Sequence, residues 1–117
     1  MSTDYAAIAF KVLEVFGEHD PAKRAEVIRD SFTEDVTFAD AEEVIVGRDG
    51  LDRKVQHLLD QAPEFVFAPV GEVRVVQNLT VLSWQLGPAG APPVLRGTDI
   101  CFIEDGLIKH LYTMLDA

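Results

Sequence analysis

The sequence predicts an α+β domain in which three helices pack on one face of a strongly curved, mostly antiparallel sheet, forming a cone-shaped barrel. Two patterns carry this prediction. In the first half of the chain apolar residues recur every three or four positions, and beyond residue 63 they alternate with polar residues between turn-forming segments. The chain has 117 residues, a usual length for one domain. We therefore expect a single domain over residues 1–117.

Three helices are predicted, each with a start or stop signal. The first covers residues 3–16, where polar side chains precede the apolar stripe. The second covers residues 21–31, because Asp20 is a favoured N-cap and the proline that follows is a favoured first helical residue. The third begins after Gly50 and closes before Pro63, since the residue before a proline is pushed out of the helical region.

The remaining elements are predicted to be strands. Two short ones are expected before the third helix, one containing Val36 and Phe38 and one formed by the β-branched run 44–46. A turn from Pro69 to Gly71 is expected to separate the first two later strands, because both residue types interrupt regular strands. The later strands are predicted at 64–70, 72–77, 80–86, 94–103 and 107–115.

Composition narrows the classes of function. The chain carries 20 acidic against 10 basic residues, and its net charge of -10 repels nucleic acids and anionic membranes. Its one cysteine, Cys101, can form neither an internal disulfide nor a cysteine-based metal cluster. The sequence has no phosphate-binding loop, metal-spaced histidines, signal peptide or membrane span. We therefore expect a cytoplasmic protein without a nucleic-acid or membrane partner, a metal or a cofactor.

Two aspartates are candidates for chemistry. Asp40 ends the strand of Val36 and Phe38 and shares their parity, which turns its carboxylate toward the apolar side. Asp99 lies inside the strand 94–103, where aspartate is disfavoured. Burial raises the pKa of a carboxyl group and suits it to acid–base work, so we expect a raised pKa at one of the two. The alternatives are a turn cap at Asp40 and a structural hydrogen bond at Asp99.

Three segments, taken together and in order, resemble the SnoaL-like branch of the nuclear transport factor 2 superfamily: residues 32–40, 84–90 and 97–108. The resemblance implies a cone formed by a bent sheet and the helices, a pocket inside the cone, and frequent dimers through the outer face of the sheet. Proteins with this scaffold include steroid isomerases, polyketide cyclases, epoxide hydrolases, dehydratases and plain binding modules, so the scaffold alone does not define an activity.

The resemblance also implies roles for the two aspartates. Asp40 falls on the position of the proton-shuttling base of the steroid isomerases. Asp99 falls on the position of the protonated acid that helps to hold the oxyanion. The isomerases also use a tyrosine of the first helix, whereas the matching positions here hold Val12 or Leu13.

Two further family patterns are incomplete in this chain. The Arg-x-Asp spacing of the epoxide hydrolases is absent, because Arg96 and Asp99 are three residues apart and would emerge on opposite faces of the sheet. The histidine that cyclases carry in the last strand is replaced by Leu111, and His110 lies one residue before it. A histidine beside Tyr112 on a strand is more often an interface or core residue than a catalyst.

These observations lead to two hypotheses of different classes. The first is a pocket for a small apolar molecule, in which Asp40 and Asp99 act as an acid–base pair in a proton-transfer isomerase, cyclase or dehydratase with a carbonyl-containing substrate. The second is a non-catalytic ligand-binding or structural module of the same fold, with Trp84 either filling the core or lining the pocket. The expected lining residues are Val12, Phe16, Val55, Trp84 and Leu111.

The last strand also predicts self-association. Along 107–115 alternate residues are expected to point to opposite faces of the sheet. One face then has Ile108, His110, Tyr112 and Met114, and the residues of the other face are apolar as well. Helices can cover only one face of a sheet, so the other face needs a partner. We therefore expect a homodimer through the outer sheet face, with His110 and Tyr112 in or beside the contact.

Overall fold

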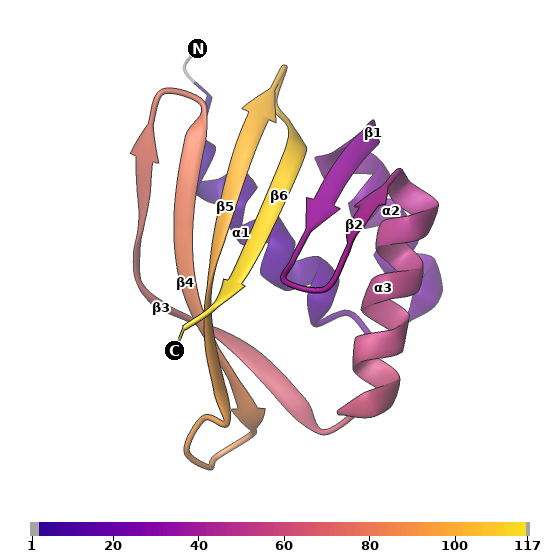
Figure 1. The fold of residues 1–117 in the computed structure, drawn as a ribbon, viewed down its shortest axis with the longest axis vertical. Coiled ribbons are helices and arrows are strands. Elements are labelled where there is room, and N and C mark those ends of the chain that lie inside the picture. The colour runs from indigo at the N-terminus through magenta and orange to yellow at the C-terminus, as the bar shows by residue number, and fades with distance from the viewer. Residues whose placement is uncertain (1–2, 117) are drawn as a thin grey trace.

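The computed structural model describes residues 3–116 and has three helices and one six-stranded sheet (Figure 1). Helices and strands follow the predicted order, with two strands between the second and third helices. The elements are α1 (Tyr5–Phe16), α2 (Pro21–Ser31), β1 (Phe32–Ala39), β2 (Val44–Val46), α3 (Arg48–Gln61), β3 (Phe65–Val76), β4 (Leu79–Pro88), β5 (Leu95–Glu104) and β6 (Leu107–Leu115).

The sheet has the strand order β2-β1-β6-β5-β4-β3. Every neighbouring pair is antiparallel except β1 and β6, which are parallel. The predicted α+β architecture is therefore confirmed, but the sheet does not close into a barrel, because β2 and β3 remain as its two edges. The strands bend around α1, and β3 crosses below the other elements toward the end of α3 (Figure 1).

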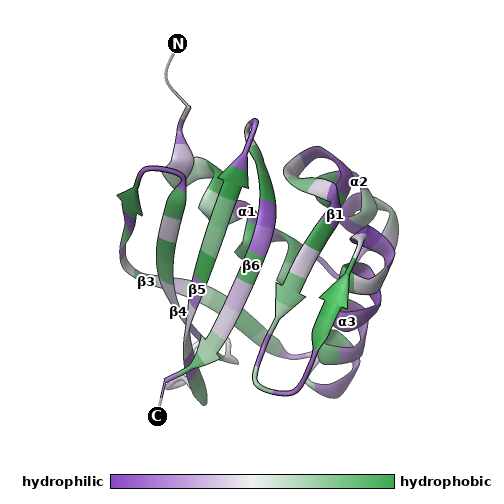
Figure 2. Cartoon of the chain, turned by 45° about the horizontal axis from the view of Figure 1, so that its top comes forward, coloured by the Kyte–Doolittle hydropathy of each residue, from purple (hydrophilic) through white to green (hydrophobic). Residues whose placement is uncertain are grey.

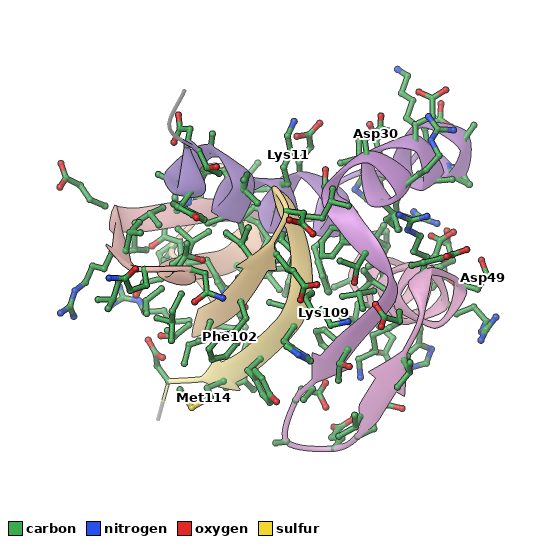
Figure 3. The ribbon with its side chains drawn as sticks, turned by 90° about the horizontal axis from the view of Figure 1, so that it is seen from above. Lys11, Asp30, Asp49, Phe102, Lys109 and Met114 are labelled. Atoms are coloured by element: carbon green, nitrogen blue, oxygen red, sulfur yellow. The ribbon has the colours of Figure 1, made fainter. Side chains whose placement is uncertain are left out.

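The helices cover one face of the sheet, which we call the inner face. Seen from above, α1 and α2 lie on one side of β5 and β6, and Phe102 and Met114 lie on the other (Figure 3). The core between the layers is apolar and includes Val12, Val15, Phe16, Ile28, Phe32, Val36, Phe38, Leu51, Val55, Leu59, Cys101, Ile103, Ile108 and Leu111.

Polar side chains fix the ends of the helices. Asp4 and Asp20 are N-caps of α1 and α2, and each accepts a hydrogen bond from a backbone N–H of the first turn.

Arg24 of α2 is 2% exposed and donates hydrogen bonds to Asp52 and Gln56 of α3 at 2.6 and 2.5 Å. This buried cation therefore joins α2 to α3 and finds a carboxylate partner there.

One predicted turn is wrong. Residues 64–70 and 72–77 were expected to be two strands, whereas β3 is one continuous strand that pairs with β4 on both sides of residues 71–73. The register shifts between Val70 and Arg74, and Gly71 has a φ of 73°, so the glycine produces a bulge in place of a turn. Pro69 is tolerated because β3 is an edge strand.

The predicted alternation of inward and outward residues along β6 is wrong at Ile108, because the strand contains a bulge. Ile103 pairs with Ile108, but Phe102 pairs with His110, so Lys109 is an extra residue in β6. Ile108 consequently points into the core and is fully buried, although strict alternation placed it with His110 and Tyr112.

Aromatic and apolar side chains gather on the outer face of β5 and β6, and no helix of residues 3–116 lies over them. Phe102, His110 and Tyr112 form an outer aromatic cluster, with ring centroids 6.1 to 6.5 Å apart. Met114 is 54% exposed on the same face. The edge strand β2 is hydrophobic throughout (Figure 2). Within residues 3–116, no helix has the length and apolar character needed to cross a membrane.

Candidate ligand-binding cavity

A cavity of about 320 Å³ lies between the last turns of α1 and α3 and the inner face of the sheet. This volume is at the lower end of the range of roughly 300–1,000 Å³ that is usual for small-molecule sites. The apolar lining residues are Leu13, Phe16, Phe38, Ala41, Leu58, Leu59, Ala62, Phe65, Phe67, Trp84, Leu86, Leu95 and Leu115. The polar lining residues are Asp40, Glu42, Lys54, Gln61, Asp99 and Thr113.

Four of the residues expected at the site line this one cavity: Asp40, Asp99, Phe16 and Trp84. The other three expected lining residues, Val12, Val55 and Leu111, are buried in the core and do not line the cavity. Periodicity identifies the side of an element that points inward. It does not reveal at which point along that side the helices and sheet pack tightly and at which point they separate.

The strand register brings the two aspartates to the same level of the sheet. Thr113 of β6 pairs with Asp99 of β5, and on the other side of β6 Tyr112 pairs with Ala39, the residue before Asp40. Because β6 lies between β1 and β5, the backbones of Asp40 and Asp99 are separated by two strand spacings, which is about 10 Å. Thr113 lies between them, so the aspartates occupy opposite sides of the cavity.

Asp99 is a buried carboxyl group with one firm hydrogen-bond partner. It is 3% exposed and accepts a hydrogen bond from Thr113 Oγ1 at 2.8 Å. Burial raises its pKa to about 6, and the hydrogen bond from Thr113 and the nearby indole of Trp84 only partly oppose that rise. The expectation of a raised pKa therefore holds for Asp99. Near neutral pH this group exchanges a proton readily.

Asp40 lies in a different environment. Its Oδ1 accepts hydrogen bonds from the backbone N–H groups of Glu42 and Glu43 at 2.9 and 3.0 Å. Asp40 therefore caps the turn, which is the alternative role considered from the sequence. Its Oδ2 lies 3.0 Å from Lys54 Nζ. Burial raises the pKa of Asp40, but the bonds from Lys54 and the two amides outweigh burial and lower the pKa overall. Asp40 is therefore ionised at neutral pH.

Lys54 is one of the residues of the site that sequence reasoning missed. Its ammonium group also lies 2.8 Å from Glu43 Oε2 and 5.9 Å from the centre of the Phe38 ring. Burial lowers its pKa, yet the two carboxylates raise it overall, so Lys54 stays charged. The available signal was its place among Leu51, Val55 and Leu58, because it is the one charged residue in the apolar stripe of α3.

The indole of Trp84 forms the wall next to Asp99. A Cβ atom added to Gly97 would collide with the indole Cζ2, so only glycine lets the ring lie against β5 at this point. Phe67 packs edge-on against the ring at a centroid distance of 5.3 Å. Trp84 is 5% exposed, and its buried Nε1–H makes no hydrogen bond within 3.5 Å in residues 3–116, although the indole is close enough to Asp99 to lower the pKa of that carboxyl group.

The remaining family-derived positions lie outside the cavity or lack the expected group. Leu13 of α1 lines the cavity where the isomerases have a tyrosine, and Val12 lies in the core. His110 lies in the outer aromatic cluster and Leu111 in the core, so no histidine lines the cavity described here. Arg96 is exposed, while Asp99 is buried on the inner face. The part of the chain from residue 3 to 116 brings together no group of three or more potential metal ligands.

Comparison with protein families identifies the class of this domain. The SnoaL-like domain model matches residues 10–111, which is most of the chain. The protein therefore belongs to the SnoaL-like family. A comparison with curated proteins finds no match.

Solved structures support the fold. A provisionally named isomerase of the SnoaL-like family from Agrobacterium tumefaciens str. C58 is 23% identical, with a TM-score of 0.90 and 97% of both chains covered. A provisionally named SnoaL-like polyketide cyclase from Jannaschia sp. CCS1 is 16% identical, with a TM-score of 0.76 over 99% of this chain and 90% of the other.

A provisionally named ketosteroid isomerase from Kribbella flavida DSM 17836 is 19% identical, with a TM-score of 0.74. The alignment covers 98% of this chain and 82% of that one. At these identities the comparisons establish the fold alone.

The raised pKa of Asp99 predicts a specific effect of pH on stability. Between the ordinary value of 3.8 and about 6, the unfolded chain has lost this proton and the folded chain still holds it, so the free energy of unfolding falls as pH rises. Asn cannot ionise. We expect the difference in unfolding free energy between Asp99→Asn and wild type, measured with urea, to move by about 2 kcal/mol in favour of Asn from about pH 4 to pH 8.

The matched control is Glu64→Gln, which removes one negative charge from an exposed position. Its difference from wild type should stay nearly constant over the same pH range. If the Asp99→Asn difference were equally constant, Asp99 would ionise normally in the folded protein.

Proposed function

We propose that this protein binds a small apolar carbonyl compound and catalyses proton transfer at a carbon next to the carbonyl group, as an isomerase, cyclase or dehydratase. One observation supports this proposal most strongly. Two of the carboxyl groups that line one apolar cavity, Asp40 and Asp99, have surroundings that move their pKa values in opposite directions. Separated pKa values of this kind provide an acid and a base in one site.

Each carboxyl group has a defined role in the proposed reaction. Asp99, protonated below about pH 6, donates a hydrogen bond to the carbonyl oxygen. Asp40, ionised, removes a proton from the adjacent carbon; the C–H electron pair forms the new C=C bond, and the carbonyl electrons move to the oxygen. Asp40 then returns the proton to another carbon of the conjugated system. The proton count balances, and no oxidant or further reactant is needed.

The lining supports an uncharged, mostly hydrocarbon substrate. Most of the side chains that face the cavity are apolar, and several are aromatic. The charges at the Asp40 end are already paired, because Lys54 contacts both Asp40 and Glu43. A charged substrate group would have to break these ion pairs or lose its own hydration.

The alternative is a ligand-binding module without catalysis. The salt bridge from Lys54 favours it, since lowering the pKa of Asp40 makes this carboxylate a weaker base. The apolar Leu13 at the wall of α1 favours it as well. In this case the cavity binds the same apolar ligands, and no C–H bond is broken.

Hydrogen exchange at carbon distinguishes the two candidates. Apolar cyclic ketones and enones are incubated with the protein in D₂O, and NMR follows the loss of protons next to the carbonyl group. We expect wild type to accelerate this exchange for at least one compound, and Asp40→Asn to slow the accelerated rate by about 100-fold or more. The rate should fall as pH rises past about 6, because Asp99 loses its proton there.

The exposed variant Glu64→Gln serves as the charge-matched control and should keep the wild-type rate. Line broadening of the same compounds reports binding independently of exchange. Binding without accelerated exchange would reject catalysis and favour the binding module. An Asp40→Asn rate equal to wild type would remove Asp40 from the mechanism.

We also propose that the protein is a homodimer formed through the outer aromatic cluster. Tyr112 is 44% exposed beside Phe102, Met114 is 54% exposed two residues further along the same face of β6, and no helix of residues 3–116 covers them. A contiguous apolar surface of this kind is costly in water, and self-association through one shared patch is the commonest solution. The net charge of -10 opposes association, but salt screens that repulsion within about 8 Å.

Analytical ultracentrifugation tests the dimer and its contact face. We expect wild type to sediment as a dimer at micromolar concentration and Tyr112→Glu to weaken the dimer by about tenfold or more, because the variant buries a charge. Phe10→Glu adds the same charge at an exposed position of α1 and should leave the dimer intact. A monomeric wild type would refute the dimer, and a Tyr112→Glu dimer as tight as wild type would refute this face.

A further inference from the structure

We propose that Glu43 is a positioning residue for Asp40: it shares Lys54 with Asp40 and keeps this buried ammonium group paired while Asp40 holds the substrate's proton. The inference rests on the proposed proton transfer, in which Asp40 is the base. It explains how a carboxylate that forms an ion pair with a lysine can still accept a proton from carbon.

The first argument is that one cation has two carboxylate partners. Lys54 Nζ lies 3.0 Å from Asp40 Oδ2 and 2.8 Å from Glu43 Oε2, and we call these three residues the Lys54 cluster. An ammonium group has three N–H donors, so it can donate to both carboxylates at once. The Lys54 side chain is 7% exposed, so its charge would be costly without a partner. With both carboxylates ionised, the cluster has one negative charge in excess.

The second argument is that the two carboxylates lie on different sides of the lysine. Asp40 and Lys54 line the cavity, whereas Glu43 does not. Glu43 and Lys54 line a second, more open pocket between β2 and α3. The side chain of Glu43 is 47% exposed and that of Asp40 only 19%. Glu43 therefore lies outside the cavity, and its carboxylate acts on Asp40 through Lys54.

The third argument is that the turn between β1 and β2 holds both carboxylates in place. The backbone N–H of Asp40 donates to the carbonyl oxygen of Glu43 at 3.1 Å, and the backbone N–H of Glu43 donates to Asp40 Oδ1 at 3.0 Å. These bonds order the turn independently of the lysine. Little further conformational freedom is therefore lost when both carboxylates contact the ammonium group.

The consequence appears when Asp40 accepts a proton and loses its charge. If Asp40 were the sole partner of Lys54, this step would leave a buried cation unpaired, which is strongly unfavourable. With Glu43 in place, the ammonium group keeps a carboxylate partner, and the excess negative charge of the cluster disappears. Glu43 therefore makes Asp40 a stronger base than a simple lysine–aspartate pair would allow.

Four other titratable groups surround the Lys54 cluster. Glu42 and Asp99 line the cavity, and Arg53 and His57 of α3 line the outer pocket. Within residues 3–116, Lys54 is the one cation that forms an ion pair with either carboxylate of the cluster. The two carboxylates are therefore coupled most strongly through this lysine.

A titration of side-chain carboxyl ¹³C shifts in Glu43→Gln tests the shared cation without any ligand. Gln has the same size and no charge, so Lys54 is left with Asp40 as its one charged partner, and we expect the Asp40 midpoint to move to lower pH than in wild type. The matched control is Glu42→Gln. It removes the same charge one residue away, from a side chain that forms no ion pair in residues 3–116, and should move the midpoint much less.

Lys54→Met shows whether the effect passes through the cation. Met is unbranched and fills a similar volume without a charge. In this background the Asp40 midpoint should be higher than in wild type, and adding Glu43→Gln should change the midpoint much less than it does when Lys54 is present. A purely structural role of Glu43 in the turn would give the same change in both backgrounds.

The exchange assay in D₂O connects this arrangement to the reaction. We expect Glu43→Gln to slow the accelerated exchange by about fivefold, because a weaker base removes a proton from carbon more slowly. The acid limb of the pH profile should move to lower pH together with the Asp40 midpoint. Glu64→Gln should again keep the wild-type rate and profile.

The outcomes separate this inference from the proposed function. An Asp40 midpoint in Glu43→Gln equal to or above that of wild type, or a lower midpoint with an unchanged exchange rate, would overturn the role of Glu43 and leave the proposed function intact. A wild type that accelerates no exchange would reject the proposed function, and a lower midpoint in Glu43→Gln would then still support the shared cation. Glu43→Gln alters an exposed side chain, so its titration decides the matter even if Lys54→Met does not fold.

Discussion

The burial of the Asp99 carboxyl group constrains the rest of the site. A carboxylate on the inner face of an apolar sheet is costly, and the protein lessens that cost with one hydroxyl donor, Thr113, and by holding the proton up to about pH 6. Two neighbours share this environment. The bare backbone of Gly97 admits the Trp84 ring beside Asp99, and the buried thiol of Cys101, whose pKa is raised to about 12 by burial and by Asp99, remains protonated.

At the opposite end of the cavity the carboxyl group of Asp40 is kept ionised. Lys54 projects from α3 toward Asp40 and Glu43, and with the turn amides it keeps Asp40 ionised in a half-buried position. The parallel pairing of β1 with β6 sets Asp40 at the level of Thr113, so the sheet topology determines how far the two carboxyl groups stand apart. A cavity with a neutral acid at one end and an ion pair at the other is polarised along its length.

Sequence patterns predicted the elements and the two aspartates because both depend on local periodicity and parity. The prediction failed where one residue changes the register: Gly71 continues β3 through a bulge, and Lys109 turns Ile108 into the core. It also placed Val12, Val55 and Leu111 in the cavity, since depth within the core depends on tertiary packing. The partnership of Lys54 with Asp40 was equally hidden, because it joins a helix to a turn 14 positions away in sequence.

The central claim is that one cavity holds two carboxyl groups in opposite states near neutral pH, and NMR titration of side-chain carboxyl ¹³C shifts tests it most directly. The account predicts a midpoint of about 6 for Asp99 and a midpoint below the ordinary value of 3.8 for Asp40. Midpoints for both residues near the ordinary value, or a higher midpoint for Asp40 than for Asp99, would contradict it.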